Sequence, residues 1–87
     1  MSDRIHLSVV TAGGTVFERN VSYVNLPTAF GSLGVLGGHA PMVCNVERGT
    51  LRCSFDGGSA RVLVGSGVAS IKDDEMLVLV SDAETEN

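Results

Sequence analysis

Residues 65–80, GSGVASIKDDEMLVLV, carry the clearest secondary-structure signal in the chain. Two mostly apolar runs, 68–71 and 76–80, flank the polar segment 72–75. Short runs of this kind separated by turn residues are typical of paired strands. An amphipathic helix would instead need apolar residues at i, i+3, i+4 and i+7 over at least about ten positions. The stretch therefore predicts an antiparallel hairpin.

The same pattern continues at the N-terminus. Ile5, Leu7 and Val9 alternate on one face of an expected first strand, a turn follows at 12–14, and a second strand ends near Arg19. A third strand is expected over residues 21–26, because Pro27 cannot donate a backbone hydrogen bond to a ladder.

The outward side of these strands carries apolar residues as well. Val10 and Val16 are expected to pair across the first hairpin, and Tyr23 is expected on the outer side of the third strand. Exposed apolar neighbours often mark an interface, so these three residues form a candidate partner-facing patch.

The two cysteines fall in the middle of the chain. Residues 42–46 and 51–55 are expected to pair about a turn at Arg48-Gly49, which places Cys44 opposite Cys53 on the inward face. A reduced pair of small buried side chains and a cross-strand disulfide are both compatible with this register. A turn at 56–58 then leads into a strand over 59–64.

These segments amount to about eight to ten short strands cut by turn residues. Eleven glycines and the lack of helical periodicity predict an all-β fold, a flattened β-sandwich or barrel. A chain of 87 residues fits a single domain over 1–87. The polar, acidic tail at 81–87 has no apolar periodicity and is expected to fray.

Composition limits the possible partners. The net charge of −4 and the scattered positions of the six Lys and Arg residues argue against nucleic acid. The longest apolar run, 76–80, is far shorter than the ~20 residues of a membrane helix, and residues 1–4 lack an apolar signal core. We therefore expect a cytosolic protein without direct lipid insertion. Cys44 and Cys53 match neither a redox pair nor a zinc spacing, which favours a reducing compartment.

No set of catalytic or metal-binding residues stands out. His39 lies among glycines and could act as a base or ligand, but no second His or Asp lies nearby in the sequence. A structural or contact role is therefore expected for His39, and a solvent-exposed strand position for His6. The sequence predicts no enzymatic activity, no cofactor and no metal.

Residues 28–41 form an expected loop that combines glycines with apolar residues. Its apolar content comes from Phe30, Leu33, Val35 and Leu36. A tight apolar loop with few charges that exposes Leu33 and Leu36 resembles the core of a protein interface. It lacks the GxxxxGK[ST] pattern of a phosphate-binding loop, so nucleotide binding is disfavoured. The loop is expected to pack or to bind a partner protein.

Residues 31–42, GSLGVLGGHAPM, resemble the signature loop of the epsilon subunit of F-type ATP synthases, which is called delta in mitochondria. The surrounding landmarks are similar to that family in the same order, and the resemblance spans nearly the whole chain. They are the first three strands, the strand start at Gly49-Thr50-Leu51-Arg52, and the closing segments 67–71 and 78–84. The chain departs from the family at Gly37, where proline is usual, and at Ser32, where an acidic residue is common.

The resemblance implies a non-catalytic rotor subunit of the central stalk. Such a subunit binds the gamma subunit and the c-ring and couples ion translocation to ATP synthesis or hydrolysis. It is peripheral at the cytoplasmic face of the bacterial plasma membrane, hetero-oligomeric in the complex and expected to be a monomer alone. The two C-terminal helices of most bacterial members are expected to be absent here. The implied c-ring and gamma contact loop comprises Gly31, Ser32, Leu33, Gly34, Leu36, His39, Ala40 and Pro41, and the implied gamma-facing patch comprises Val10, Val16 and Tyr23.

Two other classes of function stay open on the sequence. Lys72, at an expected hairpin tip, is similar to the modified lysine of lipoyl and biotinyl carrier domains, although Asp73-Asp74 does not match their motif. A free-standing β-sandwich binding module is the third possibility.

Overall fold

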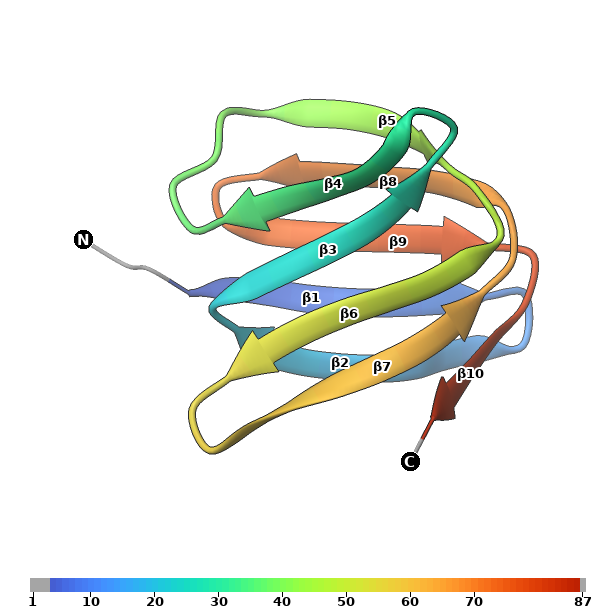
Figure 1. The fold of residues 1–87 in the computed structure, drawn as a ribbon, viewed down its shortest axis with the longest axis horizontal. Helices are drawn as coiled ribbons and strands as arrows, with labels where there is room; N and C mark the ends of the chain where they lie inside the picture. Colours follow the sequence, from blue (N-terminus) through green and yellow to red (C-terminus); the bar gives the residue numbers. More distant parts are fainter. Residues whose placement is uncertain (1–3, 87) are drawn as a thin grey trace.

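The computed structural model describes residues 4–86, which form ten strands in two stacked sheets with no helix among them (Figure 1). Sheet A has the strand order β2-β1-β9-β8-β5, and sheet B has the order β10-β7-β6-β3-β4. The strands of sheet A are β1 (Ile5–Thr11), β2 (Gly14–Val21), β5 (Met42–Val46), β8 (Gly67–Lys72) and β9 (Glu75–Val80). The strands of sheet B are β3 (Tyr23–Thr28), β4 (Gly31–Leu36), β6 (Gly49–Phe55), β7 (Gly58–Val64) and β10 (Ala83–Glu86). The predicted all-β sandwich is confirmed.

A single hydrophobic core fills the space between the sheets, because alternate residues of most strands point inward. Its largest fully buried side chains are Ile5, Leu7, Leu26, Leu51, Ile71 and Met76. Burying one aliphatic side chain of this size stabilises a fold by about 1.5–3 kcal/mol. Within residues 4–86 no polar or charged residue is buried, so the core needs no internal hydrogen bonds from side chains.

The hairpin predicted from residues 65–80 is confirmed as β8 and β9. Asp73 and Asp74 form its turn with φ angles of 52° and 61°, and Lys72 pairs with Glu75 on either side. Two consecutive residues with positive φ are typical of the type I′ turn, whose twist matches that of the strands. β9 also pairs in parallel with β1, so the first and ninth strands lie side by side in sheet A.

The first hairpin forms, but with a different register from the predicted one. Val10 pairs with Thr15, and Val9 pairs with Phe17. The register shifts between Val9 and Val10, which leaves Val16 as the extra residue of a β-bulge. The prediction that Val10 and Val16 pair is therefore wrong. The tight turn fixes the pairing near the tip, and the bulge returns Phe17 to the core side.

β3 continues through Pro27 to Thr28, so the prediction that the strand ends before Pro27 is wrong. The carbonyl oxygen of Pro27 accepts a hydrogen bond from the backbone nitrogen of Glu47 at 3.0 Å. Since N and C=O of one residue point to the same side of a strand, the proline nitrogen faces the β5–β6 connection rather than β4. The missing N–H therefore costs β3 no hydrogen bond to β4.

Cys44 and Cys53 lie in different sheets, which contradicts the predicted pairing. Cys44 is opposite Ala69 in sheet A, and Cys53 is opposite Ala60 in sheet B. The chain changes sheets between β5 and β6, so the turn at Arg48 is not a hairpin. Both thiols are free, and burial raises the pKa of each.

Two segments that were expected to be irregular form strands. Residues 31–36, inside the expected loop 28–41, are β4 and pair with β3 along its length. In the acidic tail, β10 pairs with β7 from Ala83↔Val64 to Glu86↔Arg61. The prediction that 81–87 would fray is wrong for these residues, because backbone pairing and the packing of Ala83 hold the strand. Asn87 lies outside the described residues.

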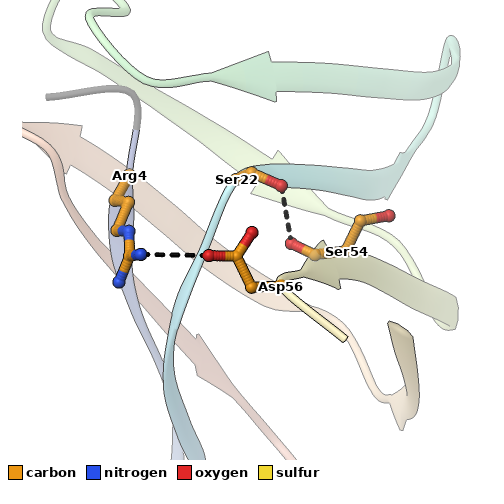
Figure 2. A network of polar contacts seen from close by, with 4 residues as sticks. All are labelled: Arg4, Ser22, Ser54 and Asp56. Carbon is orange, nitrogen blue, oxygen red and sulfur yellow. Dashed lines mark hydrogen bonds and ion pairs between the residues drawn. The ribbon is translucent and has the colours of Figure 1, made fainter. Parts of the chain in front are cut away.

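Polar contacts join the two sheets at one end of the sandwich (Figure 2). Arg4 Nη2 donates to Asp56 Oδ2 at 3.1 Å. The backbone nitrogen and the hydroxyl of Ser22 both donate to the carbonyl oxygen of Ser54, at 2.8 and 3.1 Å. Ser22 is the one residue between β2 and β3, so these bonds fix the point where the chain passes from sheet A to sheet B.

Candidate functional site

The turn between β3 and β4 presents a fully exposed aromatic side chain, Phe30. The backbone nitrogen of Phe30 donates to Thr28 Oγ1 at 3.2 Å, and this hydroxyl donates to the carbonyl oxygen of Gly31 at 2.5 Å. Gly31 has a φ of 108°, a conformation that favours glycine. Phe30 is not among the residues predicted for partner contact, yet the hydrogen bonds of this turn order its backbone and leave its side chain in solvent.

The residues predicted as one contact loop are divided between the two ends of the sandwich. The β3–β4 turn lies at one end and the β4–β5 connection at the other (Figure 1). In the β4–β5 connection, Gly38 N donates to Asp74 Oδ1 at 2.7 Å, and His39 Nδ1 donates to the carbonyl oxygen of Ala40 at 2.7 Å. Ala40 and Pro41 are exposed, and Leu36 just before them is 61% exposed.

Inside β4, part of the predicted contact set supports the fold. Leu33 packs against the core. Gly34 lies under the ring of Tyr23, where an added Cβ would come within 2.7 Å of Tyr23 Oη. Ser32 is exposed and pairs with Pro27 near the β3–β4 turn. Of the predicted loop, Gly31 and Ser32 therefore lie near Phe30, whereas His39, Ala40 and Pro41 do not.

The predicted patch of Val10, Val16 and Tyr23 is not one surface. Val10 and Val16 belong to sheet A, and Tyr23 belongs to sheet B. Val10 and Tyr23 both alternate with buried residues, so they point outward from opposite sides of the sandwich. A single flat partner surface cannot contact both.

The outward side of sheet A instead carries a set of exposed or half-exposed apolar residues, here called the apolar face. Its members are Val10, Val43, Val68, Leu77 and Leu79. Leu79 lies between Val10 and Val68 as the Cα partner of each, and Leu77 precedes it on the same side of β9. Val43 is 74% exposed and Leu79 is 48% exposed. Val10, Leu79 and Val68 therefore form an apolar row on this side of the sheet, and exposed apolar surfaces of this kind are often interfaces.

Sequence reasoning found only Val10 of this face, although a signal for the rest was present. Residues 76–80 are apolar at every position, whereas a strand with one solvated side alternates apolar with polar residues. In the structure Met76, Val78 and Val80 are buried in the core, and Leu77 and Leu79 are exposed. A fully apolar run predicts a strand that is covered on both sides.

His6 lies at the polar end of the same side of sheet A. Its Nδ1 lies 2.9 Å from Asn20 Oδ1, and its Nε2 lies 2.7 Å from Glu18 Oε2. Both oxygens are acceptors, so both contacts are hydrogen bonds only when each ring nitrogen of His6 carries a proton. The hydrogen bond to Asn20 and then that to Glu18 raise the pKa of His6, with the charges of Glu18 and Glu75 adding to the effect. His6 is outward-facing, as predicted, but it has two partners.

The other candidate residues form no reactive cluster. Within residues 4–86 no group of three or more His, Cys, Asp or Glu is arranged to hold a metal. No helix in the described part of the chain is long and apolar enough to cross a membrane. Lys72 is the last residue of β8 and the partner of Glu75, and the hairpin tip consists of Asp73 and Asp74. Lys72 therefore does not occupy the hairpin tip, the position that the carrier-domain alternative requires.

Known proteins of one family match this chain along its length. The family described as ATP synthase, Delta/Epsilon chain, beta-sandwich domain matches residues 4–86. An ATP synthase epsilon chain of Staphylococcus saprophyticus is 36% identical over 84 residues, covering 95% of this chain and 63% of the relative. That of Priestia megaterium is 37% identical over 81 residues, covering 93% of this chain and 60% of the relative. The chain thus spans somewhat less than two thirds of the length of these relatives.

Solved structures share the fold. A chain in the Euglena gracilis mitochondrial ATP synthase structure, described as OSCP/F1/c-ring, superposes with a TM-score of 0.89 at 22% identity, over 98% of this chain and 55% of that chain. A chain of the Tetrahymena thermophila mitochondrial ATP synthase central stalk and c-ring gives 0.76 at 17% identity, over 91% and 64%. On the match of the family to residues 4–86, this chain belongs to the delta/epsilon chain β-sandwich domain family of ATP synthases.

Proposed function

We propose that this domain is a non-catalytic part of the central stalk of an F-type ATP synthase, where it binds the gamma subunit and the c-ring. It would couple ion translocation to ATP synthesis or hydrolysis as a peripheral component at the cytoplasmic face of a bacterial plasma membrane. Membership of the family supports this role, and solved relatives belong to ATP synthase structures that contain a c-ring.

The apolar face is the surface that we assign to the gamma subunit, and it is the observation that carries the proposal. Leu79, Val68 and Val10 make one continuous row across three strands. An interface core of this composition is depleted in charge and rich in aliphatic surface. The face replaces the predicted patch of Val10, Val16 and Tyr23, because Tyr23 lies on the other sheet.

The end of the sandwich that carries Phe30 is the surface that we assign to the c-ring. Phe30, Gly31 and Ser32 project there from the β3–β4 turn, and the hydrogen bonds of Thr28 keep the turn ordered. An exposed aromatic side chain on a fixed turn contributes binding energy at low entropic cost. The end with His39 is then free of the ring.

Gamma binding is tested with the recombinant gamma subunit from the same genome, by size exclusion and calorimetry. We expect a stoichiometric complex, and Leu79→Asp should weaken it about tenfold or more, because a carboxylate would be desolvated at the interface core. Leu63→Asp is the matched control, since Leu63 is 41% exposed on the outward side of sheet B. Equal binding by folded Leu79→Asp would remove the apolar face from the interface. Absence of any complex with the unsubstituted chain would refute the central-stalk proposal.

The c-ring assignment is tested on a purified gamma–c-ring complex. Phe30→Asp should reduce retention of the domain by the ring, whereas Leu36→Asp should not, because Leu36 lies at the other end of β4. The opposite result would place the ring at the His39 end.

A further inference from the structure

The outward side of sheet B carries four polar residues that we call the arginine row. Asn25, Arg52, Arg61 and Glu86 are consecutive Cα partners across β3, β6, β7 and β10. Arg52 therefore lies directly opposite a second arginine. Like charges in directly opposite positions destabilise a strand pair, so the stability of the sheet does not explain this arrangement.

Arg52 differs from the other four arginines of the chain, each of which has a side-chain partner. Ion pairs of 3.1–3.2 Å join Arg4 to Asp56, Arg48 to Asp82, and Arg61 to Glu86. Arg19 stacks on Phe55 at 3.8 Å. Within residues 4–86, the Arg52 guanidinium has neither an ion-pair nor a hydrogen-bond partner. Five N–H donors in a planar fork are thus open to an acceptor.

Further hydrogen-bond donors surround Arg52. Arg52 lies in an open concavity of about 670 Å³ on sheet B. Its lining includes Tyr23, Asn25, Arg52, Arg61 and Glu86. Asn25 Nδ2 donates to Tyr23 Oη at 3.2 Å. This bond uses Tyr23 Oη as an acceptor, so the phenolic hydrogen stays available for a ligand. Gly34 leaves the space that the ring of Tyr23 occupies.

We propose that this concavity binds a carboxylate side chain from an acidic segment of a partner protein, with Arg52 as the principal ligand. A carboxylate matches the guanidinium fork with two parallel hydrogen bonds, and such charge-assisted pairs are stronger than neutral ones. Tyr23 donates a further hydrogen bond from its hydroxyl group. Arg61 adds a second positive charge that Glu86 partly offsets.

The local charge favours a carboxylate over nucleic acid. Arg52 and Arg61 against Glu86 leave a net local charge of +1, on a chain whose overall charge is −4. One carboxylate needs one cation, whereas nucleic acid binding requires several neutralised phosphates. The site lies on the opposite sheet from the apolar face, so it is independent of gamma binding and of the function proposed above.

The test uses the whole chain labelled with ¹⁵N and the probe peptide acetyl-hexaglutamate-amide at low salt. The peptide should shift the side-chain Nε–Hε signal of Arg52 with a Kd of about 1 mM. Arg52→Gln should weaken binding about tenfold. Glu86→Gln should tighten it about twofold or more, because it frees Arg61. Arg48→Gln is the matched control and should leave binding unchanged, since Arg48 pairs with Asp82 outside the concavity.

Parallel titrations use inorganic phosphate, a short single-stranded DNA and acetyl-hexalysine-amide. Binding of hexaglutamate that depends on Arg52 and strengthens in Glu86→Gln supports the proposal. Equal or tighter Arg52-dependent binding of phosphate or DNA would make this a general anion site and overturn the assignment to a carboxylate. No shift with hexaglutamate, or the same loss in Arg48→Gln as in Arg52→Gln, would also overturn it. The dispersion of the amide spectrum shows in each case that the variant is folded.

Discussion

At the scale of single residues, Gly67 is restricted to glycine by space rather than by backbone conformation. A Cβ at this position would lie 1.9 Å from the carbonyl oxygen of Leu79 and 2.7 Å from Val80 Cα. These are backbone atoms of the neighbouring strand, so relief would require β9 to move. We expect Gly67→Ala to lower the free energy of unfolding by about 3 kcal/mol, as measured by urea denaturation.

Gly13→Ala provides the control for this experiment. Its Cβ would meet Thr11 Oγ1 at an ordinary 3.7 Å, and the φ of Gly13 is not positive. The free energy of unfolding should change by no more than about 1 kcal/mol, because alanine also lowers the conformational entropy of the unfolded chain. Similar losses in both variants would mean that glycine conformation, and not the close approach of β8 and β9, limits position 67.

His6 makes a pH-dependent contribution to stability. Its pKa is raised in the folded chain by Asn20 and Glu18, so its contribution is fully present below the unfolded pKa of about 6.5 and is lost as pH rises through the folded pKa. The side chains of His6 and Glu18 are 42% and 53% exposed, so screening limits the effect to about 0.5 kcal/mol or less.

The measurement compares the free energy of unfolding of the unsubstituted chain and Glu18→Gln between pH 6 and pH 8.5. The difference should be larger at pH 6, where the imidazole is charged, and should shrink at pH 8.5. In a His6→Gln background, Glu18→Gln should show no such pH dependence. A difference that grows with pH would contradict the geometry of this pair.

At the scale of strands, the facing arginines of β6 and β7 carry a cost that a substitution can remove. Arg52→Glu would place a carboxylate opposite Arg61, and an opposite-charge pair across strands contributes roughly 0.2–1 kcal/mol. We expect a more stable protein at low salt and no gain in 1 M NaCl, where charges are screened. Arg48→Glu should destabilise instead, because it breaks the pair with Asp82. A salt-independent loss of stability in Arg52→Glu would show that the facing arginines carry no cost.

Hairpins with local turn signals could be predicted from the sequence. The turn at Asp73-Asp74 and the pairing of β6 with β7 depend on residues close in the chain, so composition was sufficient. The assignment of strands to sheets could not be predicted in the same way. Cys44 and Cys53 both point inward, and an inward residue has the same local pattern in either sheet. Only the tertiary path between β5 and β6 separates them.

β4 was missed because its glycines were interpreted as a loop. Leu33 and Val35 alternate with Gly34, which is the pattern of a strand, but glycine is depleted in strands. Gly34 is compatible with a strand here since the ring of Tyr23 occupies the space above it. β4 forms as a strand by pairing with β3 along its length, and the local sequence pattern of β4 does not contain that contact.

At the scale of the whole molecule, the predicted contact residues were separated by distance along the fold. The six-residue strand β4 separates the β3–β4 turn from the β4–β5 connection. Segments that are close in the sequence therefore lie at opposite ends of the sandwich (Figure 1). The apolar face, in contrast, joins Val10, Val43, Val68 and Leu79 from four strands spread through the chain. Long-range pairing of this kind is set by the topology, which a single sequence does not specify.

The same topology sets the expected folding speed. The parallel pairing of β1 with β9 joins His6 to Glu75, and folding must close that long loop before the pairing stabilises the sheet. Domains dominated by such non-local contacts fold in milliseconds to seconds. Stopped-flow circular dichroism after dilution from urea should find the main refolding phase in this range. A main phase in microseconds would imply that local hairpins alone determine the rate.

The alternation of the chain between sheets has a mechanical consequence. The chain passes from one sheet to the other after β2, β4, β5, β7 and β9. If one partner holds the outward side of sheet A and another pulls on sheet B, the load is shared by these covalent links as well as by the packed core. Sliding one sheet over the other would strain these backbone connections in addition to breaking the side-chain packing between the sheets. A domain built in this way transmits a sideways pull as a stiff block, and we expect it to yield first at the edge strands of the two sheets, β2, β5, β10 and β4, rather than between its layers.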